Sequence, residues 1–288
     1  MSDQTLEKLY IDGCSRQVDE TTGTRVFHVT TPHALTQASG YLKYVRGIQQ
    51  EAVFFRGQRR LYKGLAPALF RGVSNPKTQS DRIGAINTCC RLIAKANPIF
   101  DKVPPAAHEP LMQHYGLNTS WIDLVDNVWV ALWFACHRAL VSGTHDRFLH
   151  FERRNPADES VPFAFILLVA ADTVPSDPFI PGLWRGSRTE LVDLRVAAPS
   201  LFLRPHAQHG VLFRMRAKGD MRPLDYNAQT ADIIRIDLRN ALAWLGDGDM
   251  LNTHAIFPPP FYDHGYGFLL DTPVQANEIV GCIQHVGT

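Results

Sequence analysis

Apolar residues recur at helical spacing in the first half of the chain and in short runs in the second half. The helical spacing predicts helices over 35–50, 79–97 (with Ser80 as its N-cap) and 106–115. A nearly all-apolar stretch then predicts a buried central helix over 128–140, capped by Asp126 or Asn127.

Strands are predicted where Val, Ile and Phe gather in short runs. The predicted strands are a short one or a hairpin near Val26 and Val29, then 52–58, 163–169, 192–196, 211–215 and 233–238. Segment 144–162 is charged and contains proline, which predicts an exposed loop, and a helix is predicted near 238–245. Because predicted helices gather in the first half and strands in the second, the pattern favours an α+β fold over a doubly wound sheet.

Composition narrows the class of protein. The chain has 288 residues, and 29 Lys and Arg against 28 Asp and Glu leave a net charge of +1. No chain-wide basic field is therefore expected to draw it onto DNA or lipid. The 5 cysteines are odd in number and form no C-x-x-C pair, which is typical of reduced thiols in a cytoplasmic protein. The longest apolar run is too short to span a bilayer, so no membrane association is expected.

Several enzyme classes lack their motifs. The sequence has no P-loop, no Rossmann glycine pattern, no H-E-x-x-H and no G-x-S-x-G. His254, Asp263 and His264 lie near one another in sequence, but no spacing fixes a ligand geometry, and no metal is expected.

Arg56 stands at the end of the predicted strand 52–58 and is followed by Gly57. A guanidinium in this position needs anionic or hydrogen-bond partners, and its planar fork suits a phosphate. Gly57 permits close approach of a ligand or of another backbone. The alternative is a structural arginine that pairs with a core carboxylate such as Asp123.

Two further segments are unusually polar. The first, 113–123, contains His114, which could titrate near neutrality, and Tyr115, which could stack on a flat ring. The second, 206–213, contains Gln208, which could hold a substrate hydroxyl or amide. The alternatives are core aromatic residues for the first segment and an exposed hairpin turn for the second.

The three segments together carry a family pattern. It comprises Phe55-Arg56-Gly57-Gln58, His114-Tyr115-Gly116-Leu117, Thr119, Asp123, Asn127, Val130-Ala131-Leu132, Phe134-Ala135, Gln208-His209-Gly210 and Phe213. This pattern resembles the FRG domain, over a core of about residues 40–270 of a single domain that spans 1–288. The sequence departs from the family pattern at Asn118, Ser120, Val125 and Val128.

The resemblance implies a remote likeness to ADP-ribosyltransferases, which are enzymes of the glycosyltransferase class with NAD as substrate. The expected fold is a split β-sheet core with N-terminal and central helices. Arg56 would bind the NAD phosphates, and Gln58 would also contact NAD. Tyr115 would stack on nicotinamide, and His114 and Thr119 would contact the ribose or amide. Gln208 stands where these enzymes place a glutamate, and Glu190 is the alternative acid.

The resemblance also implies a toxin of a bacterial defence or toxin–antitoxin system. Its target would be RNA, DNA or a protein, and an antitoxin protein would be its partner. Local basic clusters suit nucleic acid, or else are solvated loop ends: Arg56-Arg59-Arg60-Lys63 and Arg214-Arg216-Lys218. The alternative function is a non-enzymatic module that senses a nucleotide or a phage protein through the same residues.

Overall fold

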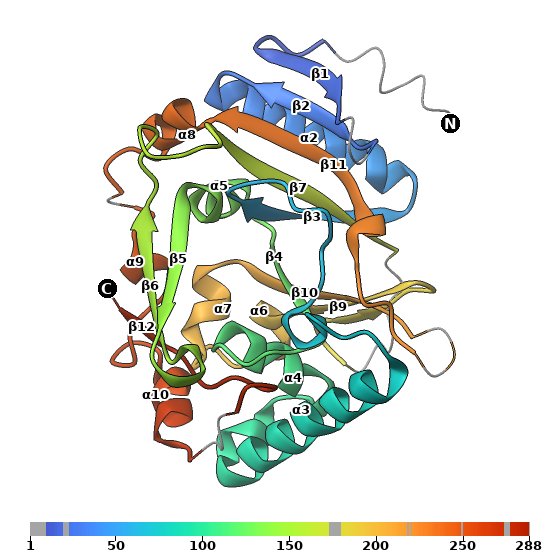
Figure 1. Ribbon diagram of the computed structural model, residues 1–288, viewed down its shortest axis with the longest axis vertical. Coiled ribbons are helices and arrows are strands. Elements are labelled where there is room, and N and C mark those ends of the chain that lie inside the picture. Colours follow the sequence, from blue (N-terminus) through green and yellow to red (C-terminus); the bar gives the residue numbers. More distant parts are fainter. Residues whose placement is uncertain are drawn as a thin grey trace.

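The computed structural model describes residues 10–19, 23–172, 180–217, 219, 221–248, 250–273 and 277–287. In these residues a large mixed sheet runs through the molecule, and a smaller sheet stands at one side of it (Figure 1). The predicted α+β class is confirmed. The predicted division into a helical first half and a stranded second half is wrong, because four strands of the large sheet precede the central helix.

The large sheet has nine strands in the order β1-β2-β11-β7-β3-β4-β10-β9-β8. All neighbouring strands are antiparallel except β2 and β11, which are parallel. In chain order the strands are β1 (Cys14–Val18), β2 (Arg25–Val29), β3 (Glu51–Gln58), β4 (Ile122–Val125), β7 (Phe163–Asp172), β8 (Leu183–Arg185), β9 (Thr189–Asp193), β10 (Gly210–Met215) and β11 (Thr230–Asp237).

The large sheet is narrow at its centre, between β3 and β4. These strands pair at one position, Phe55 with Val125, whereas β3 pairs with β7 along its whole length from Glu51 to Gln58. Beyond Phe55 the two strands diverge, and we call this divergence the fork. Among the described residues, Phe55 and Val125 are therefore the one paired position between β3 and β4.

The smaller sheet has the order β12-β6-β5. Its strands are β5 (His137–Ser142), β6 (Phe148–Arg153) and β12 (His285–Gly287). The hairpin β5–β6 corrects two predictions: the central helix ends at Cys136 rather than 140, and segment 144–162 contains a strand. The hairpin stands along the side of the large sheet (Figure 1).

In Figure 1, α2 lies beside β2 and β11, α5 lies near the middle of the molecule beside β3, and α3 and α4 lie at the far end. The helices are α2 (Pro32–Ile48), α3 (Pro76–Ala96), α4 (Pro105–His114), α5 (Val128–Cys136), α6 (Leu194–Ala197), α7 (Leu203–Ala207), α8 (Leu238–Leu245), α9 (Thr253–Ile256) and α10 (His264–Asp271). Short 3₁₀ turns are η1 (Ala68–Phe70), η2 (Pro98–Lys102), η3 (Thr144–Asp146) and η4 (Asn227–Gln229). Among the described residues, no helix is both long and apolar enough to cross a membrane.

The N-caps of α5 and α3 fix where these two helices begin. Asn127 caps α5 by accepting a hydrogen bond from the backbone N–H of Trp129 at 2.8 Å. Of the two predicted caps, Asp126 and Asn127, the second is therefore confirmed. The predicted N-cap Ser80 is wrong, because Asn75 caps α3 by accepting from Thr78 N at 2.8 Å and the helix begins one turn earlier. The α5 cap places the apolar helix directly after β4 and beside the fork.

Gly57 allows α5 to lie directly on β3. A Cβ atom at Gly57 would stand 1.9 Å from the carbonyl oxygen of Ala131 and 2.8 Å from the backbone nitrogen of Ala135. The sequence left open whether a ligand or another backbone approaches Gly57. In the structure, the backbone of α5 does so. The helix is buried among apolar residues of α2, α8, β3 and β7, which form one hydrophobic core.

Candidate functional site

Two cavities adjoin at the fork. The His114 cavity, of about 480 Å³, is lined by residues that include His114, Asp123 and Gln208. The Tyr62 cavity, of about 530 Å³, is lined by residues that include Tyr62 and Arg59. Both cavities are also lined by Arg56, Gly57, Arg71, Phe134, His137 and Ala139. The two cavities therefore adjoin along a shared wall.

Arg56 of β3 forms a hydrogen bond to β4 at the fork. Its Nη1 donates to the backbone oxygen of Asp123 at 2.6 Å, and its Nε is buried without a hydrogen-bond partner among the described residues. Burial lowers the pKa of Arg56, and the nearby Asp123 carboxylate acts in the opposite direction. Asp123 thus contacts Arg56 through its backbone rather than by the carboxylate pair considered from the sequence. Arg56 as a whole is partly buried, and a partly exposed guanidinium is suited to an anion.

His114 and Asp123 form the polar wall of the His114 cavity. Nδ1 of His114 lies 3.8 Å from Oδ1 of Asp123, and Oδ2 of Asp123 accepts from Nε2 of Gln113 at 2.8 Å. The His114 side chain is only 2% exposed, whereas that of Asp123 is 36% exposed. A Cβ atom at Gly210 would stand 2.4 Å from Nε2 of His114, so this glycine makes room for the imidazole.

Gln208 lies in the same cavity, at the end of α7. It is 4% exposed, and its Nε2 donates to the backbone oxygen of Ile256 at 3.0 Å. The amide is therefore fixed by a partner that is distant in sequence. Of the predicted site residues, the structure brings Arg56, His114 and Gln208 together at the His114 cavity and places Gln58 on the adjoining Tyr62 cavity.

The buried imidazole of His114 predicts a pH dependence of stability. Burial lowers the pKa of His114, while Asp123 acts in the opposite direction and Arg204 adds to the lowering. The unfolded chain then binds more protons than the folded chain, so the stabilisation is complete above the ordinary histidine pKa of about 6.5 and is lost as the pH falls below it. We expect the free energy of unfolding in urea to fall between about pH 7.5 and about pH 5.5.

The variant His114→Gln isolates this contribution. Its unfolding free energy is expected to fall less steeply over the same pH range, by at most about 1.4 kcal/mol per pH unit, which is the slope that one proton gives. Four other histidines whose pKa is lowered remain in the variant and keep part of the slope: His28, His137, His206 and His285. Equal slopes in parent and variant would show that His114 does not titrate differently in the folded state.

Tyr115 lies behind the cavity wall and not in it. The residue is 0% exposed, its hydroxyl donates to Oδ2 of Asp263 at 2.8 Å, and its ring stacks on Tyr266 with centroids 5.5 Å apart. The Arg204 guanidinium lies 4.5 Å from the same ring and donates from Nη1 to the backbone oxygen of His114 at 2.6 Å. The prediction that Tyr115 stacks on a ligand is wrong in this structure, because the ring is enclosed by core residues.

Thr119 is also enclosed. It is 0% exposed, its hydroxyl donates to Oε1 of Gln113, and its Oγ1 accepts from the backbone N–H of Trp121 at 3.1 Å. These bonds fix the turn between α4 and β4. The prediction that Thr119 contacts a ligand directly is corrected to a supporting role, since Gln113 in turn holds the Asp123 carboxylate.

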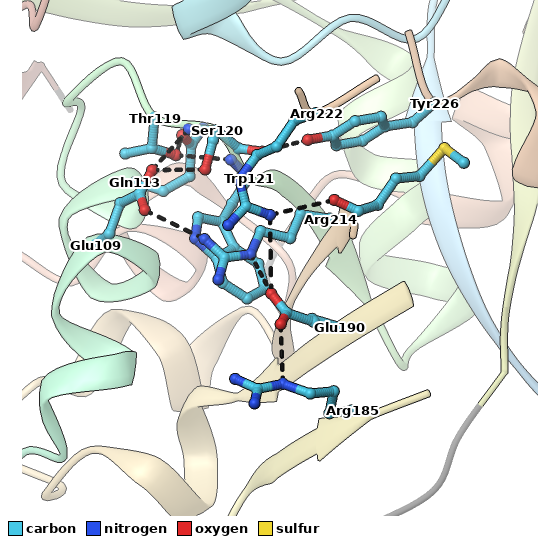
Figure 2. A network of polar contacts seen from close by, with 11 residues as sticks. Glu109, Gln113, Thr119, Ser120, Trp121, Arg185, Glu190, Arg214, Arg222 and Tyr226 are labelled. Atoms are coloured by element: carbon cyan, nitrogen blue, oxygen red, sulfur yellow. Dashed lines mark hydrogen bonds and ion pairs between the residues drawn. The ribbon is translucent and has the colours of Figure 1, made fainter. Parts of the chain in front are cut away.

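Glu190 belongs to a network that also contains Glu109, Gln113 and Thr119 (Figure 2). It lies on β9, and its carboxylate contacts Arg185 at 3.0 Å, Arg214, and Arg222 at 4.0 Å. Burial alone would raise the pKa of Glu190, but these arginines hold it below its ordinary value. Glu190 does not line the His114 cavity, so the structure gives no support to it as the missing acid.

The same network accounts for the second basic cluster. Arg214 also contacts Glu109 at 3.5 Å and lies 4.1 Å from the Trp121 ring, and Arg216 donates to the backbone oxygen of Gly186 at 2.7 Å. Lys218 lies outside the described residues. Arg214 and Arg216 are therefore committed to internal partners and do not form a free basic surface.

One wall of the His114 cavity is aromatic and was not predicted from the sequence. Phe134 of α5, Phe151 of β6 and Phe257 lie against one another there, and the Phe151 and Phe257 rings stack with centroids 4.6 Å apart. The hairpin β5–β6, which supplies Ala139, Val141 and Leu149, was not predicted either. The cavity thus has a polar wall that includes Arg56, His114 and Asp123, and an aromatic wall.

Comparison with known proteins identifies one family. Residues 51–143 match the model of the FRG domain family. No curated protein and no solved structure matches the chain. The matched segment begins at β3 and ends just after β5, so it contains the fork together with Arg56, His114 and Asp123. The similarity to the FRG domain family therefore covers residues 51–143 of the chain.

Proposed function

We propose that this protein is an NAD-dependent ADP-ribosyltransferase that acts as a toxin in a bacterial defence or toxin–antitoxin system. One observation carries the proposal. Arg56, His114 and Gln208, which come from three separated segments, line a single cavity together with the carboxylate of Asp123. A sheet that narrows to one residue pair at this point is compatible with the split sheet expected of an ADP-ribosyltransferase-like fold.

The two walls of the His114 cavity suit different parts of NAD. The Arg56 guanidinium would hold the pyrophosphate, since a partly buried cation that lines the cavity favours a phosphate oxygen. The aromatic wall of Phe134, Phe151 and Phe257 would receive the nicotinamide ring in place of Tyr115. Gln208, whose Nε2 donates to Ile256 and whose side chain also interacts with His114, would hold a ribose hydroxyl together with that imidazole.

Asp123 replaces Glu190 as the acid in this proposal. In the reaction, the bond between the ribose and nicotinamide breaks, nicotinamide leaves, and a nucleophile of the acceptor bonds to the ribose and gives up its proton. Positive charge develops on the ribose in the transition state, and a fixed carboxylate nearby would stabilise it. Asp123 is a carboxylate of the cavity wall and is held in place by Gln113.

A binding module without turnover is the second candidate. It is favoured by the amide at position 208, which supplies no charge, and by the hydrogen bond that fixes this amide to Ile256. In that case Arg56, Gln208 and the aromatic wall would bind a nucleotide, and NAD would be recovered intact.

Incubation of the purified protein with labelled NAD and bacterial lysate tests the proposal. We expect free nicotinamide to appear and the label to enter a macromolecule. Arg56→Lys is expected to lower the rate about 10- to 100-fold. Lysine keeps the positive charge but loses the planar guanidinium, which can donate two hydrogen bonds to one phosphate. Gln208→Ala is expected to lower it as well, whereas Gln49→Ala, at the C-cap of α2, serves as the matched control.

The outcomes separate the two functions. Nicotinamide release that depends on Arg56 and Gln208 supports the transferase. Saturable NAD binding with no release of nicotinamide at any time would favour the binding module. If NAD neither binds nor is cleaved, both proposals fail. Toxicity of the expressed protein, and its loss in Arg56→Lys, would test the toxin role separately.

A further inference from the structure

The Tyr62 cavity is strongly basic. Its lining includes the guanidinium-bearing residues Arg56, Arg59 and Arg71 together with His137, and no aspartate or glutamate is among its lining residues. The His114 cavity differs, because Asp123 and Asp146 line it. A cavity of about 530 Å³ with several cations and no acid in its wall favours an anionic occupant.

The carboxylates near the Tyr62 cavity are already engaged. Arg59 lies close enough to Glu159 to help lower the pKa of this carboxyl group. The Glu159 carboxylate contacts Arg154 at 3.1 Å and Arg138 at 3.8 Å. Asp225 lies beside Gly64, and its Oδ1 accepts from the backbone N–H groups of Leu65 at 2.6 Å and Asn227 at 2.9 Å. These carboxylates offset part of the positive charge, but neither of them lines the Tyr62 cavity.

Arg71 is the least engaged of the cavity arginines. Its backbone oxygen accepts from Arg82 at 2.8 Å, but its guanidinium makes no hydrogen bond or ion pair with any other part of the chain that the structure describes. The residue is exposed at the junction of the two cavities. A phosphate at this junction would give the guanidinium a partner without breaking an existing contact.

Tyr62 adds a flat platform to the basic wall. It is 44% exposed, and the Arg60 guanidinium lies 5.0 Å from the centre of its ring. Hydrogen bonds from Arg59 and Arg60 hold the pKa of Tyr62 below its ordinary value, although burial alone would raise it. Lys63 follows as a further exposed cation. Aromatic rings that alternate with cations are typical of surfaces that bind single-stranded nucleic acid by stacking and phosphate contacts.

We propose that the Tyr62 cavity binds single-stranded nucleic acid and thereby selects the acceptor of the reaction. The binding site stands on the observations above, and its role as the acceptor site rests on the proposed function. A base that stacks on Tyr62, with its phosphates on Arg59 and Arg71, would extend toward Arg56 and His137, where the two cavities meet. A protein acceptor is not favoured, since an acidic peptide would satisfy the arginines but leave the ring platform unused.

Binding of labelled RNA and DNA strands of about 12 nucleotides tests this site, with fluorescence anisotropy as the readout. The double variant Arg59→Gln/Arg71→Gln is expected to weaken binding about 10-fold or more at moderate salt. Its plot of log affinity against log salt should also flatten, by about 0.7 for each phosphate that the variant no longer neutralises. Tyr62→Ala should weaken binding of single strands more than of duplexes, and comparison of RNA with DNA identifies the preferred strand.

Arg239→Gln is the matched control, because it removes one exposed guanidinium from α8, away from both cavities. It should leave binding and the salt slope unchanged. Equal affinities and slopes for parent and double variant would overturn the site. So would an acidic peptide that binds as tightly as the strands and with the same dependence on Arg59 and Arg71.

The NAD assay separates this inference from the proposed function. If Arg59→Gln, which alters a residue that lines the Tyr62 cavity and not the His114 cavity, still releases nicotinamide but labels the strand less than the parent does, both stand. If the strand binds through Arg59 and Arg71 but NAD is not cleaved, the site stands and the transferase fails. If NAD is cleaved and the label enters protein alone, the transferase stands and the acceptor role is overturned.

Discussion

Replacing Asp123 by asparagine is expected to lower the rate of NAD cleavage about 100- to 1,000-fold, which is the usual cost of removing one fixed electrostatic group from a transition state. Asparagine has the shape of the native side chain and can keep an oxygen toward Gln113, which donates to Oδ2 at 2.8 Å. The substitution therefore removes the charge and retains most of the geometry. Nicotinamide release at saturating NAD measures the effect.

Asp126→Asn is the control for this prediction. Asp126 lies just beyond the end of β4, pairs with Lys43 and, at 3.5 Å, with Arg195, and does not line the His114 cavity. Its substitution removes the same charge three residues away and should leave the rate within about 3-fold, since screening weakens an exposed charge at a distance. If Asp123→Asn cleaves NAD as fast as the parent, the acid has been assigned to the wrong residue.

Stability must be followed in parallel, because Asp123 also faces the partly buried Arg56. Loss of the carboxylate leaves the guanidinium less compensated and is expected to cost about 1 to 3 kcal/mol of unfolding free energy. A rate measured well below the midpoint of thermal unfolding excludes simple loss of folded protein as the cause. The loss of unfolding free energy and the loss of NAD cleavage rate are then measured independently of each other.

Replacing Gly57 by alanine is expected to lower the unfolding free energy by about 3 kcal/mol, at the upper end of the usual cost of overpacking. The added Cβ would lie 1.9 Å from the Ala131 carbonyl oxygen, so β3 and α5 must move apart. The nearest atoms belong to the backbone of α5, so no flexible side chain can move aside to relieve the clash. Urea denaturation of parent and variant measures the difference.

Gly40→Ala is the matched substitution for Gly57→Ala. Gly40 lies on the exposed face of α2, and no neighbouring atom lies within 4 Å of a Cβ built there. Alanine at this position should raise stability by about 0.5 to 1 kcal/mol, because it favours the helix. A Gly57→Ala protein as stable as the parent would mean that α5 can shift on β3 at little cost.

The sequence predicted elements with clear periodicity and missed those that depend on tertiary contacts. Strand β3 and helix α3 were recognisable from their local patterns. The hairpin β5–β6 was not, because His137 follows an apolar helix without a turn signal and β6 carries charged residues. The end of α5 at Cys136 is thus set by sheet formation rather than by a sequence signal.

The site was predictable to the same extent. Arg56, His114 and Gln208 stood out as polar residues beside apolar segments, and they share one cavity. The enclosure of Tyr115 depends on Asp263, which is 148 positions further along the chain, and no local pattern reveals that hydrogen bond. Asp123 was noted as a partner for Arg56, but only the fork shows that its carboxylate also faces the cavity.

The single pairing between β3 and β4 leaves the sheet unfinished beside the His114 cavity. Each additional residue pair would satisfy backbone groups, at about 0.5 to 1.5 kcal/mol per hydrogen bond, and would close the space that Arg56 and Asp123 now line. Arg56 partly compensates by donating to the backbone carbonyl of Asp123. Selection for a more stable sheet and selection for an open cavity therefore act in opposite directions on the same few backbone groups.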